Sequence, residues 1–175
     1  MTEHAKLGRQ CGDCSLCCKV LRIPELSKPT NQWCDHCRPG QGCAIYETRP
    51  KVCREFECQW LTDLAIGEEW RPTRSKMVLR MLKLLDHDGK LLLDVNVDCG
   101  FPGAWLDSPY YEQLKKFCAG FAVQVNIGQR HIAILPHADV EFSKDGKDEC
   151  VIAFPGRHII VPAEKANQVL RGASA

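Results

Sequence analysis

The pattern of apolar and polar positions changes near residue 75. Residues 11–60 are rich in cysteine, proline and glycine, and apolar residues recur there with no regular period. From residue 75 onwards, short apolar runs alternate with turn-forming residues, a pattern typical of β-strands. The sequence therefore predicts an irregular segment that is followed by a sheet.

Several strands and two helices can be placed in the second part. An Asp88-Gly89 pair between two apolar runs predicts a hairpin, and Gly128 predicts a second one. Residues 108–119 are predicted to form a helix that Ser108 caps. The predicted strands are residues 77–85, 91–97, 121–127, 131–135, 149–154 and 158–161, and a closing helix covers residues 164–170.

The predicted fold class is α+β, because helices and an antiparallel sheet occupy different parts of the chain. An irregular, cysteine-rich N-terminal lobe is expected to pack on a small, mostly antiparallel sheet with one or two helices. Residues 1–10 are interpreted as a flexible arm, residues 11–60 as the cysteine-rich lobe and residues 61–175 as the α+β lobe. A chain of 175 residues is short enough for both lobes to form one compact domain.

Nine of the twelve cysteines are concentrated in the first third of the chain. Two Cys-x-x-Cys pairs occur there, Cys11/Cys14 and Cys34/Cys37, and this spacing lets two thiolates bind one ion. Two such pairs at this separation are typical of a four-cysteine zinc site. A second register, which pairs Cys14 with Cys17, fits the spacing equally well. The candidate metal ligands are Cys11, Cys14, Cys17, Cys18, Cys34, Cys37, Cys43, Cys53 and Cys58.

The same cysteines are also compatible with an iron–sulfur cluster. The run Cys11-x-x-Cys14-x-x-Cys17 resembles the first three ligands of bacterial ferredoxins, which bind a 4Fe–4S cluster. The fourth cysteine of that pattern and its proline are missing, and Cys18 follows Cys17 directly. Nine thiolates exceed one tetrahedral site, so the sequence predicts either two ions or one cluster with additional thiols. His36 is a further candidate ligand.

Basic residues near the cysteines could offset the negative charge of a metal–thiolate site. A zinc ion with four thiolates carries a net charge of about −2, which low-dielectric surroundings disfavour. Arg49 and Arg54 lie close to Cys53 in the sequence. We predict that these two arginines donate N–H groups to the sulfur ligands.

Two stretches of this segment together form a known motif. They read Cys11-x-x-Cys14-x-x-Cys17-Cys18 and Gly42-Cys43-x-Ile45-Tyr46-x-x-Arg49-Pro50-x-x-Cys53-Arg54-x-Phe56. The combination resembles the bacterial CxxCxxCC family of the YkgJ type, whose members are described as zinc- or iron-chelating and sometimes as Fe–S oxidoreductases. The match covers about residues 11–60. The resemblance implies thiolate ligation by Cys11, Cys14, Cys17, Cys18, Cys43 and Cys53; the Cys34/Cys37 pair and Cys58 lie outside the simplest form of the motif.

Three functional classes remain open at this point. The first is a metal-chelating protein that binds zinc or an iron–sulfur cluster through its clustered thiolates. The second is an iron–sulfur oxidoreductase or a methyltransferase-like enzyme, since flagellin lysine N-methylases contain a similar cysteine block; the chain has no recognisable nucleotide-binding glycine loop. The third is a zinc module that binds nucleic acid or a protein partner. No catalytic residue can be assigned from the sequence.

Charge and hydropathy narrow the possible partners and location. The chain has 23 basic and 22 acidic residues, spread through both halves, so neither nucleic acid nor an anionic membrane surface is an expected partner. No apolar run is long enough to cross a membrane, and the first ten residues do not resemble a secretory signal. We therefore expect a cytoplasmic protein whose cysteines stay reduced, with a protein or a small molecule as its partner.

Overall fold

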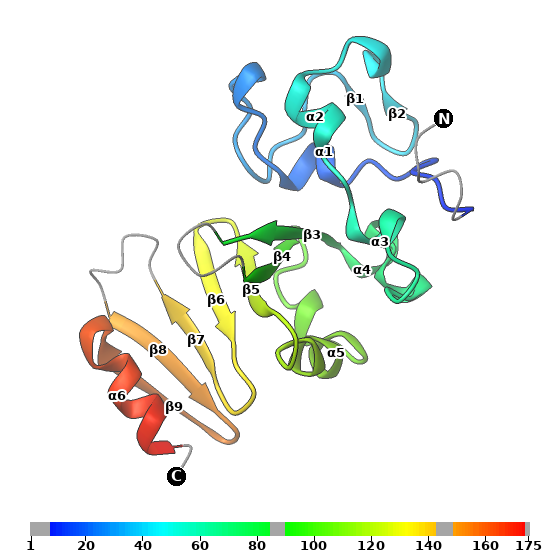
Figure 1. The fold of residues 1–175 in the computed structure, drawn as a ribbon. Helices are drawn as coiled ribbons and strands as arrows, with labels where there is room; N and C mark the ends of the chain where they lie inside the picture. Colours follow the sequence, from blue (N-terminus) through cyan, green and yellow to red (C-terminus); the bar gives the residue numbers. More distant parts are fainter. Residues whose placement is uncertain (1–7, 85–89, 143–148, 174–175) are drawn as a thin grey trace. The chain divides into compact units, whose positions relative to one another are not determined.

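The computed structural model describes residues 8–84, 90–142 and 149–173, and their chain divides into two compact units (Figure 1). The first unit comprises Met1–Arg80 and Val95–Trp105, and the second comprises Met81–Asp94 and Leu106–Ala175. The lobe boundary predicted at residues 60 and 61 falls inside the first unit. Most of the predicted flexible arm, residues 1–10, lies outside the described residues.

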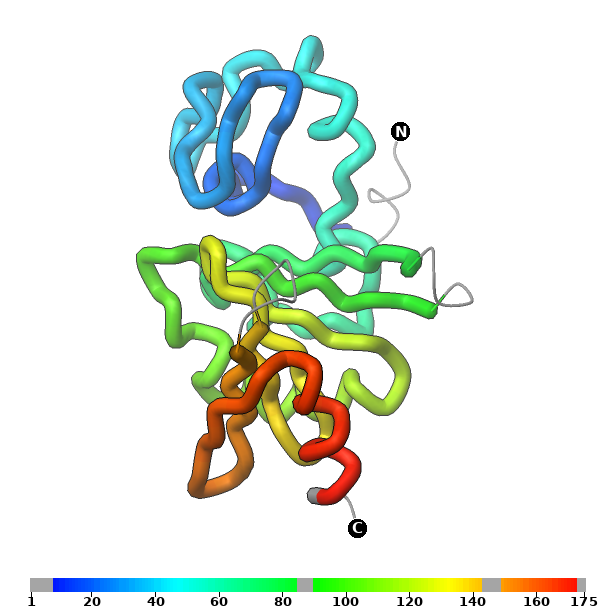
Figure 2. Tube along the Cα trace, turned by 90° about the vertical axis from the view of Figure 1, so that its left-hand side faces the viewer, coloured from blue at the N-terminus to red at the C-terminus, as the bar shows by residue number. Residues whose placement is uncertain are grey.

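The cysteine-rich segment consists of loops joined by very short elements, as its blue and cyan course in Figure 2 shows. Prolines start two of these elements: Pro24 and Pro72 occupy first helical positions, where a missing N–H does no harm. Gly42 has a φ of +100°, a backbone conformation that favours glycine. The elements are α1 (Cys17–Val20), η2 (Pro24–Leu26), β1 (Cys37–Arg38), β2 (Gly42–Cys43), η3 (Tyr46–Thr48), α2 (Lys51–Glu55), α3 (Gln59–Thr62), η4 (Glu68–Trp70) and α4 (Pro72–Ser75).

A small apolar cluster holds the first cysteine helix in place. Leu16 and Val20, which flank the cysteines of α1, pack on Val78 at 8%, 1% and 1% exposure. Cys14 and Cys17 are packed against the same cluster. The strand that begins at residue 77 therefore supports the segment that carries the Cys-x-x-Cys-x-x-Cys-Cys run.

One seven-stranded sheet runs in sequence order from β3 to β9. The four pairings from β5 to β9 are antiparallel, and the α+β class predicted from the sequence is confirmed. The sheet is larger than the small one predicted, and β7 was not predicted. The remaining elements are β3 (Met77–Lys83), β4 (Leu91–Val97), η5 (Ala104–Leu106), α5 (Tyr110–Phe117), β5 (Ala122–Ile127), β6 (Arg130–Ile134), β7 (Asp139–Phe142), β8 (Glu149–Phe154), β9 (Arg157–Pro162) and α6 (Ala163–Ala173).

The strands of the second unit alternate as a half-buried sheet requires. On β5, Val123, Val125 and Ile127 are buried whereas the residues between them are partly exposed. Helix α6 packs on β8 and β9, where Ile152 is fully buried in a cluster that includes Ala166. The alternation thus places one apolar face of the sheet inward.

Two details of the predicted elements need comment. Helix α5 begins at Tyr110, and no side chain caps it, so the predicted cap by Ser108 is wrong. Instead, the carbonyl oxygen of Asp107 accepts the N–H of Tyr110 at 2.8 Å. β3 and β4 are neighbours in the sheet, as the first hairpin predicts; its turn, at Asp88-Gly89, lies outside the described residues.

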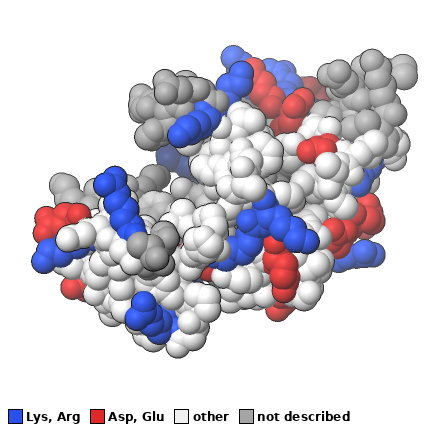
Figure 3. Space-filling view, turned by 60° about the horizontal axis from the view of Figure 1, so that its bottom comes forward, with Lys and Arg blue, Asp and Glu red and all other residues white. Residues whose placement is uncertain are grey.

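Two further observations concern helix hydropathy and surface charge. Across residues 8–84, 90–142 and 149–173, no helix has both the length and the apolar character needed to cross a membrane. On the face shown in Figure 3, basic and acidic side chains are interspersed, and neither sign forms a continuous patch.

Candidate metal centre

All nine candidate cysteines belong to the first unit, and every cysteine of the chain is a free thiol. Cys34 and Cys58 are buried, Cys11 is exposed, and the other six candidates are partly exposed. None of the nine sulfurs is therefore joined to another in a disulfide. The other three cysteines of the chain are Cys99, Cys118 and Cys150.

Both predicted Cys-x-x-Cys pairs form tight turns. The N–H of Cys14 donates to the carbonyl oxygen of Cys11 at 2.8 Å, and the N–H of Cys37 donates to that of Cys34 at 2.9 Å. A third bond, from the N–H of Cys34 to the carbonyl oxygen of Cys18 at 3.1 Å, joins the second turn to α1. This third bond brings together two cysteines that are 16 residues apart in the sequence.

Six cysteines form what we call the Lys28 thiol group: Cys17, Cys18, Cys34, Cys37, Cys43 and Cys53. A hydrogen bond with Cys17, followed by burial, raises the pKa of the Cys18 thiol far above its ordinary value. Burial, followed by the charge of Cys18, raises the pKa of Cys37 to about 11. The pKa of Cys53 is raised by burial and then by the charges of Cys18, Cys34 and Cys43. Cys37 and Cys43 are paired opposite each other in the two-stranded sheet of β1 and β2. Without metal, the thiols of Cys18, Cys37 and Cys53 therefore keep their protons at neutral pH.

Three further cysteines, Cys11, Cys14 and Cys58, form a second set that we call the Cys58 thiol group. Burial raises the pKa of Cys58 to about 11, and the charges of Cys14 and Cys11 act in the same direction. The backbone amides of Trp60 and Leu61 oppose this shift because they favour the thiolate. Burial also raises the pKa of Cys11 and of Cys14.

Basic side chains approach the Cys58 thiol group and its neighbours. Arg71 lowers the pKa of Cys14 and forms an ion pair with Asp13 at 2.5 Å. Arg49 lowers the pKa of Cys11, and its guanidinium lies 3.8 Å over the Tyr46 ring. Part of the positive charge expected near the sulfurs is thus present, and Arg71 was not anticipated from the sequence.

The two arginines predicted to contact sulfur are placed differently. The Nε of Arg49 donates to the carbonyl oxygen of Cys53 at 3.5 Å, and its Nη1 donates to that of Tyr46 at 2.5 Å. Arg54 is exposed on α2, and its guanidinium makes no hydrogen bond or ion pair within the described residues.

Lys28 is the basic residue that the sequence analysis missed. It is 6% exposed, and its ammonium donates to the carbonyl oxygens of Lys19, at 2.7 Å, and of Leu21. Burial lowers the pKa of Lys28, and the sulfurs of Cys18, Cys34, Cys17 and Cys53 oppose this shift. No motif marks this residue, because its ammonium reaches the cysteines only once the chain between Leu21 and Lys28 has turned back.

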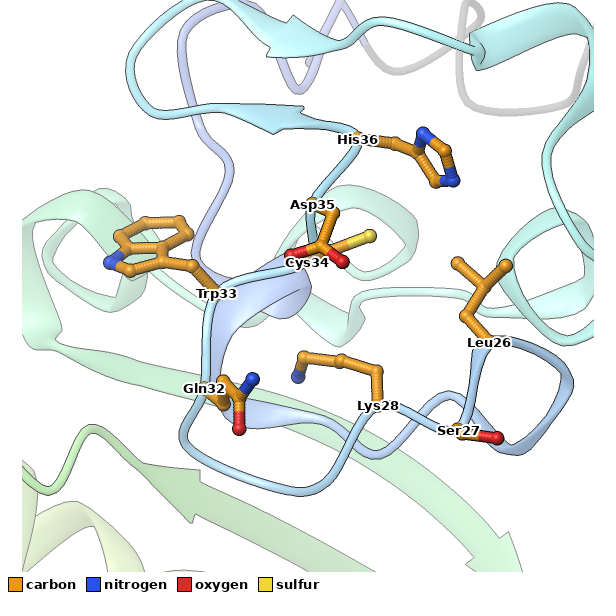
Figure 4. A pocket seen from close by; sticks show the side chains of 8 residues that line it. All are labelled: Leu26, Ser27, Lys28, Gln32, Trp33, Cys34, Asp35 and His36. Carbon is orange, nitrogen blue, oxygen red and sulfur yellow. The ribbon is translucent and has the colours of Figure 1, made fainter.

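A pocket of about 170 Å³ opens beside Lys28 and Cys34 (Figure 4). In this view, the Cys34 sulfur points into the space between Leu26 and His36, and the side chain of Lys28 lies below Cys34. His36, the tenth candidate ligand, therefore lies on the same pocket as Cys34. The lining residues are Leu26, Ser27, Lys28, Gln32, Trp33, Cys34, Asp35 and His36.

The segment 95–105 holds α1 from outside the cysteine block. Both carboxylate oxygens of Asp98 accept hydrogen bonds from the ammonium of Lys19, at 2.7 and 2.8 Å. The side-chain oxygen of Asn31 accepts the N–H of Cys99 at 2.9 Å. These contacts join α1 and the loop at Asn31 to residues more than 60 positions away.

The types of residue present suit a metal that prefers sulfur ligands, but the described side chains are not arranged around a common point. Within the described part of the chain, no three histidine, cysteine, aspartate or glutamate side chains are arranged as a metal site. Zinc and iron–sulfur clusters are nevertheless bound by thiolates, often from Cys-x-x-Cys turns, with polar or charged groups beside them. The segment contains free thiols, turns of this kind and such neighbouring groups. The ligand set predicted from the sequence therefore stays a prediction.

Comparison with known proteins adds nothing to this assignment. No protein-family model matches the chain, and no curated protein and no solved structure matches it either.

Proposed function

We propose that this protein chelates zinc or iron through the thiolates of its cysteine-rich segment. One observation carries the proposal: nine cysteines spread over 48 positions are all unpaired and belong to one compact unit. Disulfide pairing, the usual alternative for such a block, is absent from these residues. The resemblance to the CxxCxxCC family, which rests on the motif alone, supports the same conclusion.

The protons on the thiols make metal binding depend on pH. The pKa values of Cys37 and Cys58 are raised to about 11, so these thiols are neutral at pH 7 and must lose a proton before they bind a cation. Metal affinity is therefore expected to rise with pH, and binding releases protons. When bound, the metal supplies the attraction that makes thiolates stable in these partly buried positions.

A structural role for the metal follows from how little else stabilises the segment. Its helices α1, α2 and α3 have four or five residues each, too few to be stable alone. Within the described residues, α2 has no buried side chain, and α1 packs on the small cluster of Leu16, Val20 and Val78. Bound metal would contribute about 10 kcal/mol or more to the folding of such a segment. We place the protein in the cytoplasm, where reducing conditions keep these thiols free.

Elemental analysis of anaerobically purified protein tests the proposal. We expect at least one zinc or iron atom per chain, and removal of the metal by a chelator should lower the thermal stability of the cysteine-rich segment. A brown protein with absorption near about 400 nm would identify an iron–sulfur cluster, whereas zinc gives a colourless one because it is d¹⁰. Less than one metal atom per chain would contradict the proposal.

A further inference from the structure

A buried lysine without an acidic partner requires an explanation. Lys28 is 6% exposed, and within the described residues no carboxylate lies within ion-pair distance of its ammonium. Two partly buried lysines do have one: Lys19 pairs with Asp98 and Lys115 with Asp139, each at 2.7 Å. A charged group that leaves water is strongly disfavoured unless an opposite charge accompanies it.

The backbone holds Lys28 in this position. Ile23 and Lys28 exchange both of their backbone hydrogen bonds, at 3.0 and 3.1 Å, and so close the loop between them. The side chain then reaches the carbonyl oxygens of Lys19 and Leu21, at the end of α1. Lys19 follows Cys17 and Cys18 directly, so the ammonium is anchored beside the helix that carries two candidate ligands.

Cysteines lie on the elements next to this ammonium, and the charges of Cys18, Cys34, Cys17 and Cys53 act on it. Cys17 and Cys18 lie on α1, and Cys34 is bonded through its N–H to the Cys18 carbonyl. Cys34 also lines the same pocket as Lys28 (Figure 4). We propose that Lys28 is the counter-ion of a metal–thiolate site formed by cysteines of the Lys28 thiol group. This inference rests on the function proposed above.

Helix capping alone is the competing explanation. An ammonium has three N–H donors, and the carbonyl oxygens of Lys19 and Leu21 use two of them. A neutral amide could serve those two acceptors as well, whereas only a cation can offset thiolate charge. With zinc and four thiolates, Lys28 reduces a net charge of about −2 to about −1. The two explanations therefore separate when charge and hydrogen bonding are changed independently.

Two substitutions make that separation. Lys28→Gln keeps N–H donors and removes the charge, and Lys28→Arg keeps the charge. Lys51→Gln is the matched control, because Lys51 lies in the same segment with its side chain 73% exposed. The full chain is reduced anaerobically, and its affinities for zinc and, separately, for ferrous iron are measured by competition with a chromophoric chelator. Circular dichroism of each loaded variant verifies folding.

We expect Lys28→Gln to weaken metal binding about 10- to 100-fold, the range typical of residues that support metal ligands. Lys28→Arg should recover most of that loss, and Lys51→Gln should bind as the wild type does. A Lys28→Gln variant with unchanged affinity would overturn the inference, and so would a Lys28→Arg variant as weak as Lys28→Gln. A wild-type chain that binds neither metal would contradict the proposed function itself.

A measurement on the wild-type protein covers the case in which Lys28→Gln does not fold. Lysine acetylation by a small reagent is followed by mass spectrometry in the metal-loaded and the chelator-treated protein. Lys28 should be protected in the loaded protein and reactive after the metal is removed, while Lys51 reacts equally in both. If Lys28 in the loaded protein reacts as fast as Lys51, the inference is wrong.

Discussion

The contact between Asp98 and Lys19 gives the sharpest prediction of stability. Asp98 is 4% exposed, and it accepts two hydrogen bonds from the Lys19 ammonium, at 2.7 and 2.8 Å, and one from the N–H of Gly100 at 2.8 Å. Asp98→Ala removes all three and leaves the ammonium without its partner. Breaking a buried pair in this way costs about 3–5 kcal/mol. Because the Lys19 side chain is still 23% exposed, water can solvate it, and we expect a loss near about 3 kcal/mol.

Urea unfolding of the reduced, metal-free protein measures this loss. Tryptophan fluorescence reports on the first unit, since Trp33, Trp60, Trp70 and Trp105 all belong to it. Glu55→Ala is the control, because its pair with Lys51 is exposed on both sides (65% and 73%) and long, at 3.5 Å; such pairs contribute less than about 1 kcal/mol. If Asp98→Ala costs no more than Glu55→Ala, the Asp98 contact does not hold α1 as described.

Three other predictions concern the thiols and the sheet. The pKa of Cys58 is raised from 9.0 to about 11, so the folded metal-free protein binds its proton more tightly than the unfolded chain. Stability should be fully present below pH 9 and fall by about 3 kcal/mol as the pH rises through 11; urea midpoints that do not change over this range would refute the shift. Cys11→Ser and Cys53→Ser should each lower bound metal and thermal stability together, whereas Cys150→Ser, in the second unit, should leave the metal content from elemental analysis unchanged; equal metal loss in all three would disprove the ligand assignment. Ile152→Ala creates a cavity at a fully buried position and should cost about 2–5 kcal/mol in urea unfolding followed by circular dichroism, and a cost below about 1 kcal/mol would show that the site is not a packed core.

Strands with regular alternation could be predicted from the sequence. Residues 91–97 and 149–154 match β4 and β8 residue for residue, because apolar side chains recur there between turn-forming segments. Strand β7, Asp139–Phe142, escaped prediction because it is short and begins with an aspartate. Asp139 is buried there only because Tyr111 and Lys115 donate to its two oxygens, at 2.8 and 2.7 Å. Those partners come from a helix more than 20 residues away, which no local pattern reveals.

In the candidate site, too, local features could be predicted from the sequence, whereas features that depend on distant contacts could not. The Cys-x-x-Cys turns are local, and the spacing of the cysteines alone predicts them. The positions of Lys28 and Asp98 depend on contacts formed after the chain folds back on α1, and Asp98 is 79 residues from Lys19. Arg49 and Arg54 lie close to a cysteine in the sequence, yet closeness in sequence does not fix where a long side chain points. The cations that approach the sulfurs include Lys28 and Arg71, which the motif does not mark.

X-ray absorption at the metal edge of the loaded protein tests thiolate ligation most directly. The measurement returns the element type and distance of the atoms bound to the metal. We predict a first shell dominated by sulfur, at about 2.3 Å for zinc. A first shell of nitrogen and oxygen alone, near about 2.0–2.1 Å, would contradict the account, because the clustered cysteines would then not be the ligands.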